Sequence, residues 1–289
     1  MGLFLALLAS VSSGVSAVYS KKGLGEADQY LVNAVTNLVI VVIFAAAVLM
    51  SGSFEQLTEL QHPIYLTISS LTLSAAWVFY YLGLADGPVG GVLALQNLAI
   101  IFTMILESLV LGIEIRNTML FGVGLIAAAS VLMTEPSRER HPSGQSRRWV
   151  LYEILSAMFM SVSFIFTKMD TSPVDSNLAS GIRYSVVTIT AFILMFLTGS
   201  HRTGGSRSAR RISCAAWRSI VLGGVFLGIG YIALYKAMTL NTAILVTTIF
   251  RFNVVFASVL FTVFLKEKQS FRSVLGLCAM TGGIVLFAV

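Results

Sequence analysis

Long apolar runs recur along the whole chain, and they constrain its fold more than any other feature. Each run holds about 17 to 25 residues, the length that an α-helix needs to cross a bilayer core. With 56% hydrophobic and only 11% charged residues among 289, the chain is predicted to be an all-α integral membrane protein. We expect ten transmembrane helices near 2–20, 29–50, 64–84, 88–111, 117–134, 149–168, 176–197, 215–236, 242–265 and 271–289.

The first run is expected to stay in the protein as a helix. It lacks a basic segment before it and a convincing small-residue cleavage site, so it does not match a removable signal peptide. No connector between the runs exceeds about twenty residues, which leaves no room for a soluble catalytic domain. The sequence shows no nucleophile paired with a base, no metal-ligand cluster and no phosphate-binding loop, so neither an enzyme nor a cofactor is expected.

The chain contains an internal duplication. Near the ends of its two halves, a shift of 153 positions brings Glu114 onto Glu267. Near their starts, a shift of 147 positions superposes six identical pairs: Val15, Ser16, Lys21, Asp28, Leu31 and Val39 on Val162, Ser163, Lys168, Asp175, Leu178 and Val186. We predict a first five-helix repeat at 1–134, a connector at 135–147 and a second five-helix repeat at 148–289. Since five is odd, the two repeats must be inverted in the membrane, as in many secondary transporters.

Two stretches resemble a known repeat unit: AAWVFYYLGLADGPVGGVLALQNLAIIFTMILESLVLGIE, and the later segment that begins YIALYKAMTLNTAILVTTIFRFN and continues through LKEK. They are similar to the repeat of the drug/metabolite transporter superfamily, EamA type. Through the duplication the resemblance covers essentially the whole chain. It implies a ten-helix carrier or exporter of small metabolites. The KKGL segment after the first run is also similar to NIPA-type magnesium transporters, so a cation transporter or channel is an alternative, and a non-transporting membrane scaffold is another.

The basic residues are unevenly divided between the two sides of the membrane. When the ends of the spans are assigned alternately, the side that holds the N-terminus has three basic residues and the other side has fourteen. The positive-inside rule therefore predicts a cell-membrane protein with both termini outside, whereas the family resemblance implies termini in the cytoplasm. The net charge of +6 is explained by basic connectors such as 199–211, which can contact anionic lipid head groups, and no nucleic acid partner is expected.

Arg251 and Asn253 lie near the middle of the ninth span. A charge at that depth costs several kcal/mol. We therefore expect Arg251 to bind an anion or to pair with the carboxylate of Glu107. The alternative is that Arg251 belongs to a purely structural buried ion pair. The shift of 153 aligns Asn253 with Ile100, which makes Asn253 a predicted cavity wall. Because two residues turn a helix by about 200°, Arg251 is expected to face away from Asn253.

The fourth span carries a polar stripe. Gln96, Thr103 and Glu107 are seven and eleven residues apart, which at 100° per residue places them within about 40° of one helix face. We expect this stripe to line a solute path, with Glu107 as a proton or cation site or as the counter-charge to an arginine. In the alternative interpretation, Glu107 reaches water at the end of the span or belongs to a structural ion pair.

The second and seventh spans are polar at equivalent positions. Asn33 and Asn37 occupy the places that Ser180 and Tyr184 occupy in the other repeat, and Arg183 lies on the same face. Polar residues that repeat in register indicate a face turned toward the interior, so Asn33, Asn37, Arg183 and Tyr184 are candidate pathway residues. Asparagines also join helices to one another, which is the alternative for Asn33 and Asn37.

Aromatic residues complete the predicted pathway. Trp77 in the third span and Tyr231 in the eighth lie a turn or more inside the membrane, whereas Tyr80, Tyr81 and Tyr235 fit an interfacial belt as well. The sequence therefore predicts an alternating-access carrier for a small polar or amphipathic solute. Protons are a second expected partner through Glu107, and the sequence gives no oligomeric state.

Overall fold

The computed structural model describes residues 1–60, 63–112, 114–134, 148–169, 174–200, 212–240, 246, 249–264 and 271–288. Within these residues every regular element is a helix: α1 (Gly2–Leu24), α2 (Gln29–Ser51), the 3-10 helix η1 (Ser53–Glu59), α3 (Pro63–Asp86), α4 (Val89–Gln96), α5 (Ala99–Leu111), α6 (Asn117–Thr134), α7 (Arg148–Met169), α8 (Ser176–Leu197), α10 (Cys214–Leu240), α12 (Asn253–Phe264) and α13 (Phe271–Ala288). The predicted connector 135–147 and most of the basic connector 199–211 lie outside the described residues.

The helices fall where the apolar runs predict them, and the all-α membrane fold is confirmed. Seven segments of the described chain are long and apolar enough to cross a membrane, with α4 and α5 counted together, and three shorter apolar helices occupy the remaining predicted spans. α1 ends at Leu24 rather than near residue 20. Lys21 lies in this added part of α1, and its Nζ donates to the carbonyl oxygens of Ala85 at 3.1 Å and Gly87 at 2.8 Å, at the end of α3. A cation at a helix C-terminus stabilises the unpaired carbonyls there.

The duplication is visible in local structure. Asp28 caps the N-terminus of α2 by accepting a hydrogen bond from the backbone N–H of Tyr30 at 2.9 Å. Asp175, its partner at the shift of 147, caps α8 in the same way by accepting from Asn177 at 2.9 Å. A capping carboxylate satisfies backbone donors that the first helical turn leaves unpaired. The sequence repeat therefore encodes equivalent helix starts in both halves.

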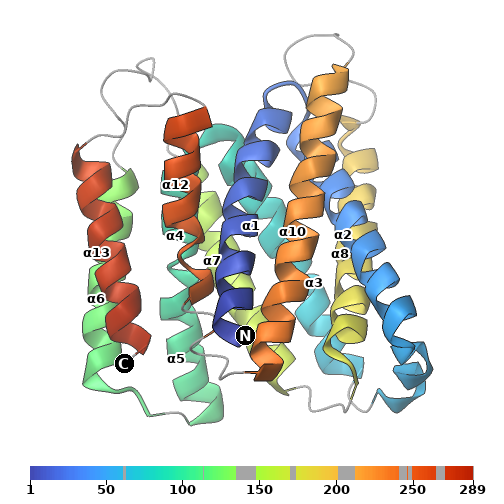
Figure 1. Ribbon diagram of the computed structural model, residues 1–289, viewed down its shortest axis with the longest axis horizontal. Helices are drawn as coiled ribbons and strands as arrows, with labels where there is room; N and C mark the ends of the chain where they lie inside the picture. The colour runs from blue at the N-terminus through green and yellow to red at the C-terminus, as the bar shows by residue number, and fades with distance from the viewer. Residues whose placement is uncertain are drawn as a thin grey trace.

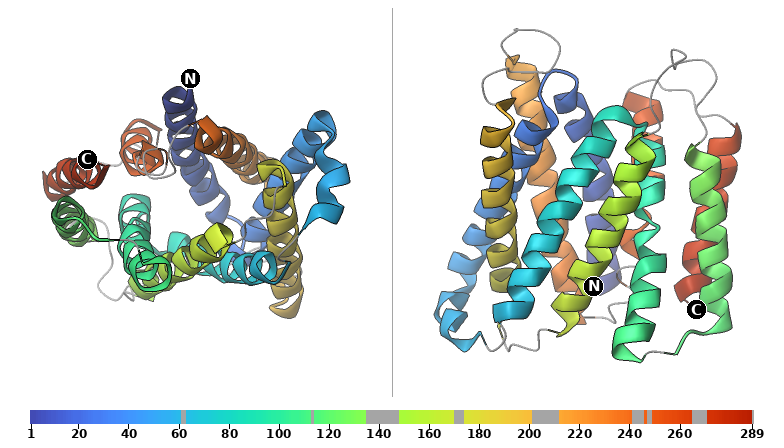
Figure 2. Two further views of the ribbon diagram at one scale, coloured as in Figure 1. Left: turned by 90° about the horizontal axis from the view of Figure 1, so that it is seen from below. Right: turned by 180° about the vertical axis from the view of Figure 1, so that it is seen from behind.

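Helices from the two halves pack in pairs. The most extensive contacts join α1 with α10, α3 with α7, α2 with α8, and α6 with α13, and each pair takes one helix from each repeat. Figures 1 and 2 show α6 and α13 at one edge of the bundle, α2 and α8 at the other, and both chain ends at the same end of the molecule. The middle of the bundle thus lies between the repeats, at the seams formed by α1–α10 and α3–α7.

Two predicted spans are interrupted at the same place in each repeat. The fourth span breaks at Asn97 and Leu98 between α4 and α5, and the ninth has a turn at Arg251 and Phe252 before α12 begins. The prediction that each of these spans is one continuous helix is therefore wrong. The starts of α5 and α12 differ by 154 residues, so the local repeat offset is 154 rather than 153, and Arg251 is the repeat partner of Asn97. Broken helices at a repeat interface are a common feature of transporter binding sites.

Candidate solute-binding cavity

A cavity lies between the repeats in the middle of the bundle. Side chains from α1, α3, α4, α7, α8 and α10 line it, together with Phe250, Arg251 and Asn253 around the start of α12. The centre of a water molecule can occupy about 60 Å³ of it. Because one water takes roughly 10–15 Å³ by this measure, the cavity has room for several waters or a small part of an organic solute. Seven of the eleven predicted site residues line it: Trp77, Gln96, Arg183, Tyr184, Tyr231, Arg251 and Asn253.

Aromatic rings from both repeats form much of the cavity wall. Trp77 stacks on Tyr81 with ring centroids 5.8 Å apart, and its edge meets Tyr231 at 6.5 Å. Tyr231 in turn lies 5.5 Å from Tyr184. All four side chains are buried or half-buried, so Tyr81 belongs to this wall rather than to an interfacial belt. Ring faces of this kind bind planar apolar groups, and they also attract cations.

Arg251 lies at the break in the ninth span. Its guanidinium donates from Nη1 to Oδ1 of Asn97 at 3.4 Å, so the two repeat-related break points contact each other. Asn97 also donates from Nδ2 to the sulfur of Met280 at 3.2 Å, which fixes the orientation of its amide. Arg251 is only 9% exposed. Because a guanidinium has five N–H donors, a single long hydrogen bond leaves most of its capacity for an anion or water.

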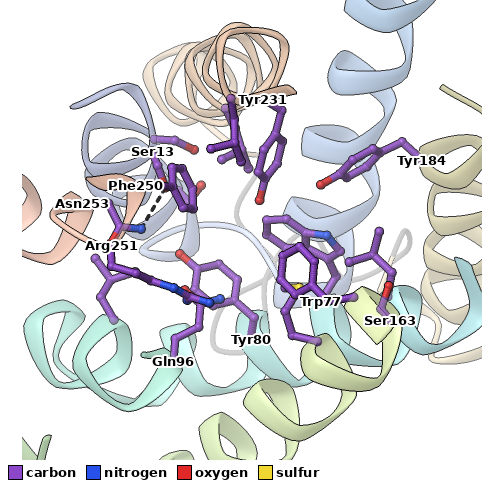
Figure 3. A pocket seen from close by; sticks show the side chains of 18 of the residues that line it. Ser13, Trp77, Tyr80, Gln96, Ser163, Tyr184, Tyr231, Phe250, Arg251 and Asn253 are labelled. Carbon is purple, nitrogen blue, oxygen red and sulfur yellow. Dashed lines mark hydrogen bonds between the residues drawn. The ribbon is translucent and has the colours of Figure 1, made fainter. Parts of the chain in front are cut away.

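Arg183 supplies a second buried cation. Its Nη2 donates to Oγ of Ser163 at 2.9 Å, and its Nε has no hydrogen-bond partner. Ser163 in turn donates to the carbonyl oxygen of Ser69 at 2.8 Å across the α3–α7 seam. In Figure 3, Arg251 and Gln96 lie toward one side of the cavity, and Ser163 and Tyr184 lie toward the other. The cavity therefore has a cationic group toward each side.

Asn253 lines the cavity together with Arg251, although a continuous helix would turn them apart. The turn at 251–252 removes the expected 200° rotation, so both residues reach the same space. Nδ2 of Asn253 donates to Oγ of Ser13 on α1 at 3.2 Å (Figure 3), and Oδ1 of Asn253 has no partner. An amide oxygen that is buried without a partner can accept a hydrogen bond from a solute.

Four predicted pathway residues do not line the cavity. Asn33 and Asn37 are buried in α2, where Nδ2 of Asn37 donates to the backbone and side-chain oxygens of Asn33 at 2.9 and 2.6 Å. Thr103 and Glu107 lie on α5 beyond the break at Asn97, so the expected polar stripe is divided and only its first member, Gln96, lines the cavity. Glu107 is half-buried and lies in the last two turns of α5, about 15 Å of helix beyond Asn97.

Sequence reasoning did not single out the serines that line the cavity. Ser13, Ser16 and Ser20 face it from α1, at spacings of three and four that place them on one helix face. Ser163 faces it from α7 and is the repeat partner of Ser16 at the shift of 147. A search for serines that recur in register between the first and sixth spans would have found Ser16 and Ser163, but not Ser13 and Ser20, whose repeat partners are Met160 and Thr167. The cavity is polar and cationic: of the described residues that line it, two are arginines and none is acidic.

Two inverted bundles of apolar helices with a polar cavity at their interface define a multi-pass membrane transporter. Comparison with known proteins agrees. A model described as the EamA-like transporter family matches residues 1–135 and 147–289, one match for each half. The chain belongs to the EamA-like transporter family, as the sequence resemblance predicted.

Two similar proteins are known. An "Uncharacterized transporter in cobO 3'region" of Sinorhizobium sp. is 28% identical over 132 residues, which are 45% of this chain and 94% of that relative. That relative is therefore about the length of one repeat. A protein of known crystal structure superposes with a TM-score of 0.72, covering 99% of this chain and 95% of that one at 14% sequence identity. At this identity the second comparison shows a shared fold.

Proposed function

We propose that the protein is an alternating-access carrier for a small organic anion that bears a flat apolar group. The observation that carries the proposal is the cavity between the repeats, in which Arg183 and Arg251 are buried beside the rings of Trp77, Tyr184 and Tyr231. A buried cation with spare donors is costly unless an anion or a polar network compensates it. An aromatic or otherwise planar carboxylate matches both the cations and the rings.

The same cavity argues against the cation-transporter alternative. A pathway for magnesium or another cation needs carboxylate or carbonyl oxygens and a negative field. The described residues that line the cavity include two arginines and no acid, and no cluster of three potential metal ligands occurs in the described part of the chain. A scaffold would have no need of a cavity with room for several waters and a cation toward each side. The organic anion therefore fits the cavity better than either alternative.

A binding experiment tests this proposal with phenylpyruvate, which joins a ring to a carboxylate. We expect it to raise the melting temperature of the purified protein, because a ligand at a hundred times its Kd stabilises the native state by about 2.7 kcal/mol. The neutral analogue 2-phenylethanol and magnesium chloride should give little shift. In proteoliposomes, phenylpyruvate should show saturable counter-exchange. Stabilisation by magnesium alone, or a current that does not saturate, would contradict the proposal.

Membrane orientation is a separate prediction. The charge distribution favours both termini outside the cell, and the two ends of the chain lie at the same end of the bundle (Figure 1), so one fusion reports on both. An alkaline phosphatase fused to the C-terminus should be active in intact cells, and a green fluorescent protein fused there should be dark. Bright fluorescence with inactive phosphatase would show the opposite orientation, with both termini inside.

A further inference from the structure

Glu153 is a buried acid that does not line the cavity. It lies in the second turn of α7, is 0% exposed, and neither of its carboxyl oxygens has a hydrogen-bond partner. Its neighbours on the same face behave differently. Ser156 donates to the carbonyl of Ala76 at 2.9 Å, and Ser163 donates to that of Ser69, so these side chains join α7 to α3. Because an unpartnered carboxylate is very costly inside a membrane protein, this environment favours the neutral acid.

The opposite helix provides a space shaped for this carboxyl group. Glu153 packs against Gly83 of α3, and a Cβ at Gly83 would lie 2.9 Å from Cδ and 3.0 Å from Cγ of Glu153 and would clash with Oε1. Any side chain at position 83 would therefore displace the carboxyl. The acid and the glycine form a complementary pair across the seam between the two repeats.

The α1–α10 seam, which the repeat relates to the α3–α7 seam, shows that helix packing alone does not require an acid at this position. At the shift of 147, Glu153 corresponds to Ala6 of α1. At the shift of 154, which superposes the cavity residues Trp77 and Tyr231, Gly83 corresponds to Ala237 of α10. Ala6 and Ala237 are both fully buried and belong to the same apolar cluster. One seam thus packs alanine with alanine where the other packs glutamate with glycine.

Few titratable or charged groups face Glu153 from the elements around it. On α3, Tyr80 lines the cavity and is close enough to interact electrostatically with Glu153. On α7 itself, Tyr152 turns to stack on Phe79 at 6.3 Å, and Arg148 is exposed. α4 has no titratable side chain, and the acid of α5, Glu107, lies near the other end of that helix. Among the described residues named here, Tyr80 is therefore the one that both lines the solute cavity and interacts with this acid.

We propose that Glu153 is a proton-binding site that couples transport to protons. The acid keeps its proton while the α3–α7 seam is packed against Gly83, and releases it when the repeats rock apart and water reaches the carboxyl. This inference rests on the proposed carrier function, because rocking of one repeat against the other opens the seam. The cycle moves a proton and an organic anion together, and no other reactant is needed.

The protonation of Glu153 is measured directly by infrared spectroscopy of the reconstituted protein. At neutral pH, the wild type should show the carbonyl stretch of a protonated carboxylic acid, and Glu153→Gln should lack it. Glu55→Gln, which changes an exposed acid in η1, is the matched control and should keep the band. Glu107→Gln tests the rival acid and should also keep it. A band unchanged in Glu153→Gln would overturn the proposal.

Coupling is measured in phosphatidylcholine vesicles with phenylpyruvate as the probe. With one proton per anion, a gradient of one pH unit should drive about tenfold accumulation in the wild type, since 1.36 kcal/mol corresponds to a factor of ten. Glu153→Gln should reduce that accumulation to about onefold and retain counter-exchange. If this variant does not fold, the double variant Gly83→Ala, Glu153→Ala recreates the alanine packing of the other seam and takes its place.

The outcomes separate the two proposals. Tenfold accumulation by Glu153→Gln, with counter-exchange intact, would overturn the proton site and leave the carrier standing. Loss of accumulation in Glu107→Gln alone would move the proton site to Glu107. If the wild type neither binds nor exchanges phenylpyruvate, the proposed solute class fails, and the infrared band alone decides whether Glu153 holds a proton.

Discussion

Replacing Arg251 by glutamine is expected to weaken the binding of phenylpyruvate about a hundredfold. Loss of a buried charge that pairs with a ligand costs about 2–5 kcal/mol, and each 1.4 kcal/mol is a factor of ten. Glutamine can still hydrogen-bond to Asn97, which Arg251 contacts at 3.4 Å, so the local structure should be retained. Affinity can be measured by the concentration dependence of the melting temperature and by the half-saturation of counter-exchange.

The stability of the unliganded variant separates binding from folding. A buried cation with spare donors destabilises the empty protein, so Arg251→Gln should melt at the same temperature as the wild type or higher. Arg218→Gln is the matched control, because Arg218 is an exposed arginine of α10 and should leave both affinity and stability unchanged. If Arg251→Gln bound phenylpyruvate normally but was less stable, Arg251 would be a structural residue and the anion site would lie elsewhere.

Replacing Gly14 by alanine is expected to lower the melting temperature by roughly 5 °C and to impair transport. α1 and α12 approach so closely there that a Cβ would lie 2.9 Å from the backbone nitrogen of Ala257 and 3.1 Å from the carbonyl oxygen of Asn253. Backbone atoms cannot rotate away as a side chain can, so the helices must separate. Overpacking of this kind costs about 1–3 kcal/mol, and 1 kcal/mol shifts the melting temperature by about 2–4 °C in a domain of 150–250 residues.

The control for this prediction is Gly124→Ala in α6, where a new Cβ would meet nothing within 4 Å. Alanine is the better helix former, so this variant should be neutral or slightly stabilised. The contrast removes the general effect of a glycine-to-alanine change in a helix. Because Ser13, next to Gly14, accepts the hydrogen bond of Asn253, separation of the two helices should also weaken phenylpyruvate binding. An unchanged melting temperature in Gly14→Ala would show that the α1–α12 contact is looser than described.

Much of the fold could be predicted from the sequence because bilayer spanning and duplication leave strong, local signals. An apolar run must be helical to satisfy its backbone in lipid, so hydropathy alone located the helices. The predicted bounds 117–134 and 176–197 agree with α6 and α8. Asp28 and Asp175 lie at equivalent helix starts in the two repeats, and the register between them was correct. The family could also be identified before any tertiary contact was known.

The candidate site was less predictable, because it depends on where helices stop being regular. The face of a residue follows from its number only while each residue turns the helix by about 100°. The breaks at Asn97 and Arg251 interrupt that count. They bring Arg251 and Asn253 into the same cavity and separate Gln96 from Thr103 and Glu107.

The sequence by itself determined that this chain spans a membrane as two repeats of an EamA-like transporter, because apolar length and internal repetition are properties of consecutive residues. Only the tertiary structure decided which polar side chains meet. Arg183 lies beside Ser163 of another helix, and Glu153 packs against Gly83 of the other repeat. Such contacts join residues far apart in the chain, and their geometry follows from how whole helices pack rather than from any local pattern.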